Sequence, residues 1–381
     1  MNPSAEAAAG KGTMGRAALQ LFGAALGLRA ALLAVVFLVR REPWEHFLTT
    51  SDAGSFIAAG KVIYGASPAS VLSLYDTRVF PGWPLLFGWG LRLGLPDPFV
   101  LAFSVVLAAL VPVLFLRLTG ERVLAWYLVY LPPAWLVASS HPISEPAYLA
   151  VMLLGLLALK AGRPAWAGAA GGFLVVLRAF GIAWLGATLL ALLVGARRLS
   201  RPVLLAGLAA AVPIAGLFAL NLHLYGDPLH QLHVYARPLQ DLNIPPVLAA
   251  SLHNPSGHWG WPFEHLLLTP WRTPVPLWKT VYIYAHIPVL VVLFGRGLRQ
   301  LGRSLEPWDR ALVLGFLANA ALIVCTGPYW GFESFDRYFV WGLPGALWLA
   351  RPWLGAQPRW HWVLGPLSVA IALRALLSHL G

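Results

Sequence analysis

Charged residues are scarce in this chain of 381 residues: Asp, Glu, Lys and Arg make up 11% of it, against about 25% in a soluble domain. Cysteine is represented by Cys325 alone, which excludes a disulfide within the chain. The sequence contains no P-loop, no HExxH and no zinc-type Cys/His spacing. It also shows no internal repeat of the transporter kind.

Long apolar runs fill most of the sequence, whose mean hydropathy is +0.69, and several exceed the roughly 18 residues that cross a bilayer. They predict an all-α fold: a polytopic bundle of about eleven transmembrane helices, in a single membrane-embedded domain over 17–381. Residues 1–16 are expected to form a disordered cytoplasmic tail. The expected spans are 17–39, 97–117, 122–139, 146–161, 164–180, 181–196, 201–221, 279–295, 309–326, 336–351 and 360–378.

The basic residues lie in short clusters between the apolar runs, a pattern typical of loops that face the cytoplasm. The formal net charge of +12 is therefore interpreted as a topology signal, and nucleic acid is excluded as a partner. More than half of the 27 Lys and Arg fall on one side when the spans alternate. We expect the chain in the cytoplasmic membrane, with its N-terminus inside.

Two long segments, 40–96 and 222–278, fall on the outer side in this arrangement. Counting 81–95 as a further span would reverse every later loop and oppose the charge bias. We therefore expect a helix there that lies at the outer interface or dips partway into the membrane. Trp83 and Trp89 suit that depth.

Polar side chains are distributed unevenly between the two sides. Of the 15 acidic residues, 11 fall on the outer side, and all histidines except His361 lie in outer segments or the outer parts of spans. Acidic residues contribute little to topology. The asymmetry therefore indicates chemistry or polar-ligand binding at the outer face, unless it only reflects the greater length of the outer loops.

Asp52, in SDAGSFIAAG, is an isolated carboxylate near the outer end of the first span. Desolvation at the edge of the hydrocarbon disfavours the charged carboxylate, and this suits a general base that works near neutral pH. The alternative is structural: Ser51 or Asp52 is also well placed to cap the helix that follows.

The stretch SSHPISEPAYLAVMLL places His141 and Glu145 at the outer mouth of another span. Glu145 is a candidate second carboxylate for the site of Asp52, with His141 as a further substrate ligand. The alternative for Glu145 is that it only stabilises a helix start, where acidic side chains are favoured.

Arg178, in FLVVLRAFGIAW, lies in a very tight connection between two apolar runs. A guanidinium at membrane depth usually faces a cavity or a partner. Its planar fork suits phosphate oxygens, which makes Arg178 a candidate for binding a phosphate. The alternative is that its side chain reaches out to lipid head groups.

Two later stretches supply the remaining candidate substrate-binding residues. In NLHLYGDPLHQLHVYARP, Asp227 and His230 are expected to hydrogen-bond substrate, since their spacing matches no metal motif. In GFESFDRYFVWG, Arg337 is expected to hold an anionic group or to pair with Asp336. A helix-start acid beside an interfacial arginine is the alternative there. No metal and no other cofactor are expected.

In their order along the chain, these stretches resemble the GT-C class of integral-membrane glycosyltransferases. The nearest branch is that of the mannosyltransferase adding the second mannose to GPI anchors, with its prokaryotic relatives. FPGWPLL after Asp52 is similar to Phe-Pro-Leu-Tyr-Pro-Leu-Leu, SEPAY to a Tyr-Ser-Glu-Ser segment, and LRAFG to Thr-Arg-Ser-Asn-Gly. YGDPLHQLHVYA and FDRYFVWGLPGALWLA complete the ordered set. The branch usually has an aromatic residue before the first-loop Asp, where this chain has Ser51.

The resemblance implies a GT-C-like arrangement in which Asp52, on the first outer loop, is the catalytic acidic residue. It also implies a polyprenyl-phosphate sugar as donor. The expected reaction is the transfer of a hexose such as mannose to a lipid or glycan acceptor at the outer face, with inversion, among membrane lipids. The alternative is a transporter or flippase for a polar or lipid-linked substrate, favoured by Arg29 in the middle of the first span.

Overall fold

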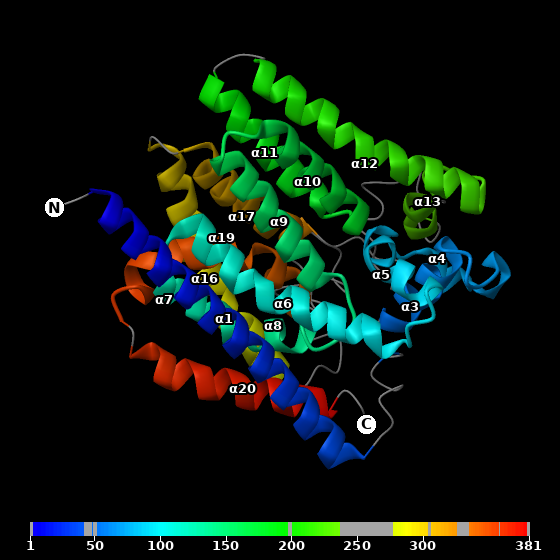
Figure 1. Ribbon diagram of the computed structural model, residues 1–381, viewed down its shortest axis with the longest axis horizontal. Coiled ribbons are helices and arrows are strands. Elements are labelled where there is room, and N and C mark those ends of the chain that lie inside the picture. Colours follow the sequence, from blue (N-terminus) through cyan, green and yellow to red (C-terminus); the bar gives the residue numbers. More distant parts are fainter. Residues whose placement is uncertain are drawn as a thin grey trace.

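The fold is helical throughout the part of the chain that the computed structural model describes. This part comprises residues 3–41, 48, 52–196, 200–236, 277–303, 306–325, 335–357 and 359–378. Within it, 84% of the residues are in helices and none belongs to a strand (Figure 1). The prediction of an all-α fold is confirmed.

The long helices follow the apolar runs closely, because each run ends at a Gly, Pro or basic cluster that stops a helix. They are α1 Pro3–Arg40, α6 Pro98–Thr119, α9 Glu145–Lys160, α10 Pro164–Leu177, α11 Gly181–Ala196, α12 Arg201–Tyr225, α16 Leu277–Leu301, α17 Pro307–Cys325, α19 Phe335–Leu354 and α20 Trp360–Ser378. Helix α1 also extends through most of 1–16, the stretch expected as a disordered tail.

Three helices of the described residues are long and apolar enough to cross a membrane: Met14–Arg40, Pro98–Thr119 and Arg201–Tyr225. The last of these leaves large apolar side chains uncovered, among them Leu208 at 69% and Val212 at 71% exposure. An extended apolar face of this kind is expected where a helix contacts lipid.

The predicted span 122–139 is wrong as a single helix. It forms two short helices, α7 Arg122–Tyr130 and α8 Pro133–Ala138, separated at Leu131 and Pro132. Proline lacks a backbone N–H and restrains the residue before it, so the two consecutive prolines here end one helix and start the next.

The first long loop folds into short helices that pack against one end of the bundle. These are α3 Ala53–Ile63, a 3₁₀ turn at Ala69–Val71, α4 Leu74–Thr77 and α5 Gly82–Arg92. A helix was predicted within 81–95, and α5 confirms it. The side chain of Trp83 is fully buried within the protein, with the indole N–H donating to the Pro142 carbonyl. Trp89 is 45% exposed.

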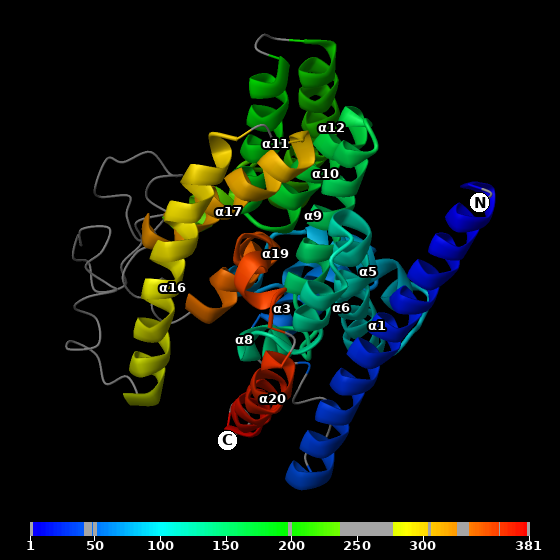
Figure 2. The ribbon, with the colours of Figure 1, turned by 90° about the vertical axis from the view of Figure 1, so that its left-hand side faces the viewer.

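Several helix ends meet this folded loop. Lys61 of α3 pairs with Asp97 at the start of α6, α5 packs against the end of α10, and the short helix α13, His230–Ala236, packs against α4. Figure 1 shows α3, α4, α5 and α13 gathered at one end of the molecule, and Figure 2 shows α1 and α16 on opposite sides of it. The start of α6, the end of α10 and the end of α12 are the helix ends that the predicted alternating topology assigns to the same side of the membrane.

Candidate functional site

Asp52 directly precedes α3 and occupies the N-cap position of that helix, with φ −82° and ψ −1°. Its side chain makes no capping hydrogen bond to the helix. The residue is only 9% exposed. Capping therefore does not explain why a carboxylate stands here, and its side-chain contacts have to be sought elsewhere.

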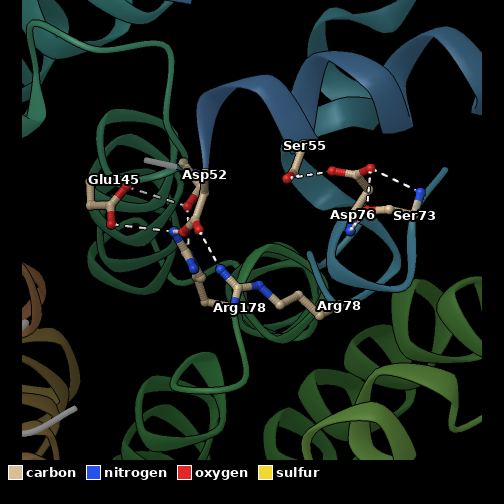
Figure 3. A network of polar contacts seen from close by, with 8 residues as sticks. Asp52, Ser55, Ser73, Asp76, Arg78, Glu145 and Arg178 are labelled. Carbon is tan, nitrogen blue, oxygen red and sulfur yellow. Dashed lines mark hydrogen bonds and ion pairs between the residues drawn. The ribbon is translucent and has the colours of Figure 1, made fainter. Parts of the chain in front are cut away.

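Two arginines from different parts of the chain hold the Asp52 carboxylate (Figure 3). Arg78 Nη2 donates to Asp52 Oδ1 at 3.1 Å, and Arg178 Nη2 lies 3.5 Å from Asp52 Oδ2. The exposed fractions of the three side chains are 13% for Asp52, 14% for Arg178 and 18% for Arg78. Two cations thus compensate one carboxylate in surroundings that are largely shielded from water.

Arg178 reaches this position because α10 ends one residue before it. Arg178 itself is extended, with φ −159° and ψ 143°, and α11 starts at Gly181. A Cβ on Gly181 would lie 2.1 Å from the carbonyl carbon of Leu174, so the hairpin closes this tightly only with glycine. The short connection leaves the guanidinium pointing toward Asp52 instead of out to lipid (Figure 3).

Glu145 is the second carboxylate of the cluster. It begins α9 and its side chain is fully buried, with Oε1 3.4 Å from Arg178 Nη2. The hydroxyl of Ser144 accepts a hydrogen bond from Arg178 Nε at 2.7 Å and donates to Glu145 Oε2 at 3.5 Å. A buried carboxylate is costly unless it is paired, and Arg178 supplies the pairing charge.

Aromatic rings enclose the Arg178 guanidinium. Its Cζ atom lies 5.4 Å from the ring centre of Phe56, on α3, and 5.9 Å from that of Trp341, on α19. These distances suit cation–π attraction. The rings also exclude water, which strengthens every charge interaction of the cluster.

The loop 139–144, which delivers Ser144 and Glu145, is buried along its whole length. Arg29 Nε donates to Ser139 Oγ at 2.7 Å, and Ser104 Oγ donates to the His141 carbonyl at 2.8 Å. Side chains of α1 and α6 therefore fix the loop from outside. The His141 ring bonds to the Val137 carbonyl at 2.8 Å.

Asp76, on α4, is a second carboxylate in the first loop. It accepts hydrogen bonds from the hydroxyls of Ser55 and Ser73, both at 2.7 Å (Figure 3). Partial burial acts to raise the pKa of Asp76, but these hydrogen bonds and the nearby Arg78 charge outweigh it, so the pKa lies below its usual value. The Asp76 carboxylate thus links Ser55 of α3 to Ser73 and stabilises the loop next to Arg78.

Asp227 and His230 lie apart from the Asp52 cluster. Asp227 Oδ2 is 2.6 Å from His233 Nδ1, while the His230 ring stacks on Tyr225 at 4.0 Å. Slight desolvation acts to raise the pKa of Asp227, but the hydrogen bonds from His233 and Leu229 lower it below its usual value. Helix α13, which begins at His230, packs against α4 of the first loop.

Arg337 belongs to α19, but its side chain, like that of Asp336, lies outside the described residues. The described residues include no group of three or more His, Cys, Asp or Glu placed to hold a metal ion. Of the seven predicted site residues, the structure thus brings Asp52, Glu145 and Arg178 into one cluster.

Arg78 is the member of the cluster that the sequence interpretation missed. The available signal was its position: Arg78 lies in the long loop 40–96, between Asp52 and FPGW. The aromatic wall from Trp341 was also missed, since nothing in the sequence relates α19 to the α10–α11 hairpin.

The fold and the site together define an all-helical protein with candidate membrane-spanning helices and a buried arginine–carboxylate cluster. Comparison with protein-family models gives no match, and a search of curated proteins gives none either. The function is therefore argued from the cluster and from the resemblance of its sequence stretches.

Proposed function

We propose that this protein is a GT-C-type membrane glycosyltransferase. It moves a hexose such as mannose from a polyprenyl-phosphate donor to a lipid or glycan acceptor at the outer face of the cytoplasmic membrane. The observation that carries the proposal is the Asp52 carboxylate lying between Arg78 and Arg178, at 3.1 and 3.5 Å. About eleven spans cross the membrane in this proposal: the ten long helices described above, and α7 together with α8.

The two arginines bind the phosphate of the donor. A guanidinium presents a planar fork that matches phosphate oxygens, and two of them here converge on one point. As the bond between the anomeric carbon and the phosphate oxygen breaks, negative charge grows on the leaving phosphate. Fixed cations in a site shielded from water stabilise that charge most effectively.

Asp52 is the base. Its carboxylate accepts the proton of the acceptor hydroxyl, whose oxygen forms a bond to the anomeric carbon on the face opposite the phosphate. The bonding electrons of the broken C–O bond leave with polyprenyl phosphate, and the product has inverted configuration. A carboxylate held by two arginines is fixed in position, and it is released for proton transfer as the arginines turn to the phosphate.

Glu145 acts through Arg178. Glu145 Oε1 lies 3.4 Å from Arg178 Nη2, and Ser144 accepts a hydrogen bond from Arg178 Nε, so both hold the guanidinium while the same Nη2 lies 3.5 Å from Asp52. Glu145 is thus a positioning residue that keeps one arginine charged and aligned for the donor. His141, Asp227, His230 and Arg337 remain candidate substrate ligands.

The transporter alternative depended on Arg29. Its guanidinium is fully buried and bonds to Ser139 Oγ and to the carbonyls of Ala25 and Val129, and it stacks on Trp135. These contacts tie α1 to the break between α7 and α8. They give the buried arginine a structural role without a transported substrate, although its Nη2 has no partner among the described residues.

The test is an assay of the purified protein in lipid nanodiscs. It is incubated with polyprenyl-phosphate sugars that carry labelled hexoses, and free polyprenyl phosphate and labelled product are measured. Release of polyprenyl phosphate that depends on the protein supports the proposal. Intact donors that cross the bilayer of proteoliposomes, without cleavage of any of them, would establish the transporter alternative instead.

A further inference from the structure

Four aromatic side chains from three parts of the chain gather on one side of Arg178. Trp341, on α19, lies 4.8 Å from Phe180, 5.0 Å from Tyr338 and 5.6 Å from Tyr148, measured between ring centres. Tyr148 belongs to α9 and Phe180 to the α10–α11 connection. The catalytic cluster therefore has an aromatic wall that the mechanism above does not use.

Two polar atoms of this wall have no hydrogen-bond partner among the described residues: the Tyr148 hydroxyl and the Trp341 indole nitrogen. The residues are 0% and 1% exposed. A buried donor without an acceptor costs free energy, and folded proteins keep few of them. Two such donors on neighbouring rings call for an acceptor that the described part of the chain does not provide.

Both donors lie beside the proposed phosphate-binding arginine. The Trp341 ring centre is 5.9 Å from Arg178 Cζ. Tyr148 follows Glu145, the partner of Arg178, by three residues, about one helical turn, and its ring centre lies 5.6 Å from that of Trp341. A group joined to a phosphate held by Arg178 would therefore be next to these two donors.

We propose that Tyr148 and Trp341 form the subsite for the sugar ring of the donor. This inference rests on the proposed glycosyl transfer and deepens it. Hydroxyl oxygens of a pyranose accept hydrogen bonds from Tyr148 O–H and Trp341 N–H, and its apolar ring face packs against the aromatic wall. Ligand pockets commonly combine apolar and aromatic surfaces with a few polar groups in this way.

The chemistry of the wall selects a neutral hydroxyl over a second anion. Tyr148 and Trp341 are neutral donors surrounded by rings, where a further negative charge would lose its hydration without a cation of its own. Uncharged hydroxyl oxygens carry no such penalty. A site built to hydrogen-bond a hydroxyl also discriminates strongly against an analogue that lacks it, since its buried donors are then left unpaired.

The chain offers matched pairs of variants for the test. Tyr148→Phe removes one hydroxyl and keeps the ring; Tyr127→Phe, on α7, is its control, because the Tyr127 hydroxyl is also buried without a partner. Trp341→Phe likewise has Trp184→Phe, on α11, as its control. All variants are compared in nanodiscs with two probes, polyprenyl-phosphate mannose and polyprenyl phosphate without sugar.

We expect Tyr148→Phe to weaken binding of polyprenyl-phosphate mannose about tenfold, the usual effect of one hydrogen bond. Binding of polyprenyl phosphate without sugar should stay unchanged, and Tyr127→Phe should alter neither. Melting temperatures should stay equal or rise, because the tyrosine variants remove a buried group that had no partner. Trp341→Phe should likewise weaken binding of polyprenyl-phosphate mannose and leave binding of polyprenyl phosphate unchanged. It provides the test of the subsite if Tyr148→Phe fails to fold.

Wild-type affinity of both Tyr148→Phe and Trp341→Phe for the mannose probe would overturn the subsite while leaving glycosyl transfer standing. Equal weakening for both probes would also overturn it, because the donors would then serve the phosphate. If the wild-type protein binds neither probe, the proposed function itself fails and takes the subsite with it.

Discussion

Asp52 and Arg178, which lie far apart in the sequence, are joined by a 3.5 Å contact between Oδ2 and Nη2 in a site that is largely closed to solvent. The same Nη2 atom lies 3.4 Å from the buried Glu145 carboxylate. One guanidinium thus links a candidate base to a structural anchor. Substitutions at the anchor should therefore lower the stability of the protein, whereas substitutions at Asp52 should lower its activity.

The Arg178–Glu145 pair should reveal itself in stability. Arg178→Met leaves Glu145 buried without its cation, which we expect to cost about 3–5 kcal/mol. Changing both, in Arg178→Met with Glu145→Gln, removes the unpaired charge and should restore much of the loss. Melting in detergent, followed by tryptophan fluorescence, tests this. A double variant that is as unstable as the sum of the two single changes would contradict the pairing.

Arg78 should matter for the donor more than for stability. Its contact with Asp52 is at 3.1 Å, and its side chain is more exposed than that of Arg178. We expect Arg78→Gln to raise the KM for polyprenyl-phosphate mannose by about tenfold or more, since a charged hydrogen bond is worth about 1.5–3 kcal/mol. The KM for the acceptor should change little. A larger effect on the acceptor would argue against a phosphate role.

Gly82 should be irreplaceable because of space. A Cβ there would lie 2.7 Å from backbone atoms of Val176 and Leu177, just before Arg178. We expect Gly82→Ala to destabilise the protein by about 1–3 kcal/mol, as overpacking does, and to reduce transfer by displacing Arg178. Gly207→Ala on α12 is the matched control, because nothing lies within 4 Å of its added Cβ. Equal melting temperatures for the two variants would contradict this packing.

Asp76 predicts a pH dependence of stability. Its pKa is lowered in the folded protein, so its contribution is present above the unfolded pKa of about 3.9 and is lost as the pH falls through the folded pKa. We therefore expect Asp76→Asn to melt below the wild type at pH 7. The difference should shrink as the pH falls below about 4. A melting-temperature difference between Asp76→Asn and wild type that grows as the pH falls would contradict a lowered pKa for Asp76.

The sequence alone was enough to predict the long helices. Apolar runs bounded by proline, glycine and basic clusters have few alternatives to helices, and α6, α9 and α12 begin and end near the expected residues. The break within 122–139 was missed although Pro132 and Pro133 announce it. The continuous apolar run favours a single helix there, whereas the two prolines favour a break.

The candidate site was predictable in part. Asp52, Glu145 and Arg178 stand out because charge within apolar surroundings needs a reason. Arg78 and Trp341 do not, because their contacts arise from how the first loop and α19 fold back on α10, which no local pattern encodes. Trp83 shows the same limit: no local pattern indicates that tertiary packing buries its side chain.

The measurement that tests the central claim most directly is sugar transfer by Asp52→Asn. The substitution keeps the shape of the side chain and removes the charge and basicity that proton transfer needs. Asp97→Asn, which breaks only the partly exposed pair with Lys61, is the control. We predict that Asp52→Asn folds in membranes and loses transfer by about 10²-fold or more, while Asp97→Asn keeps it. Near-wild-type transfer by a folded Asp52→Asn protein would contradict the account.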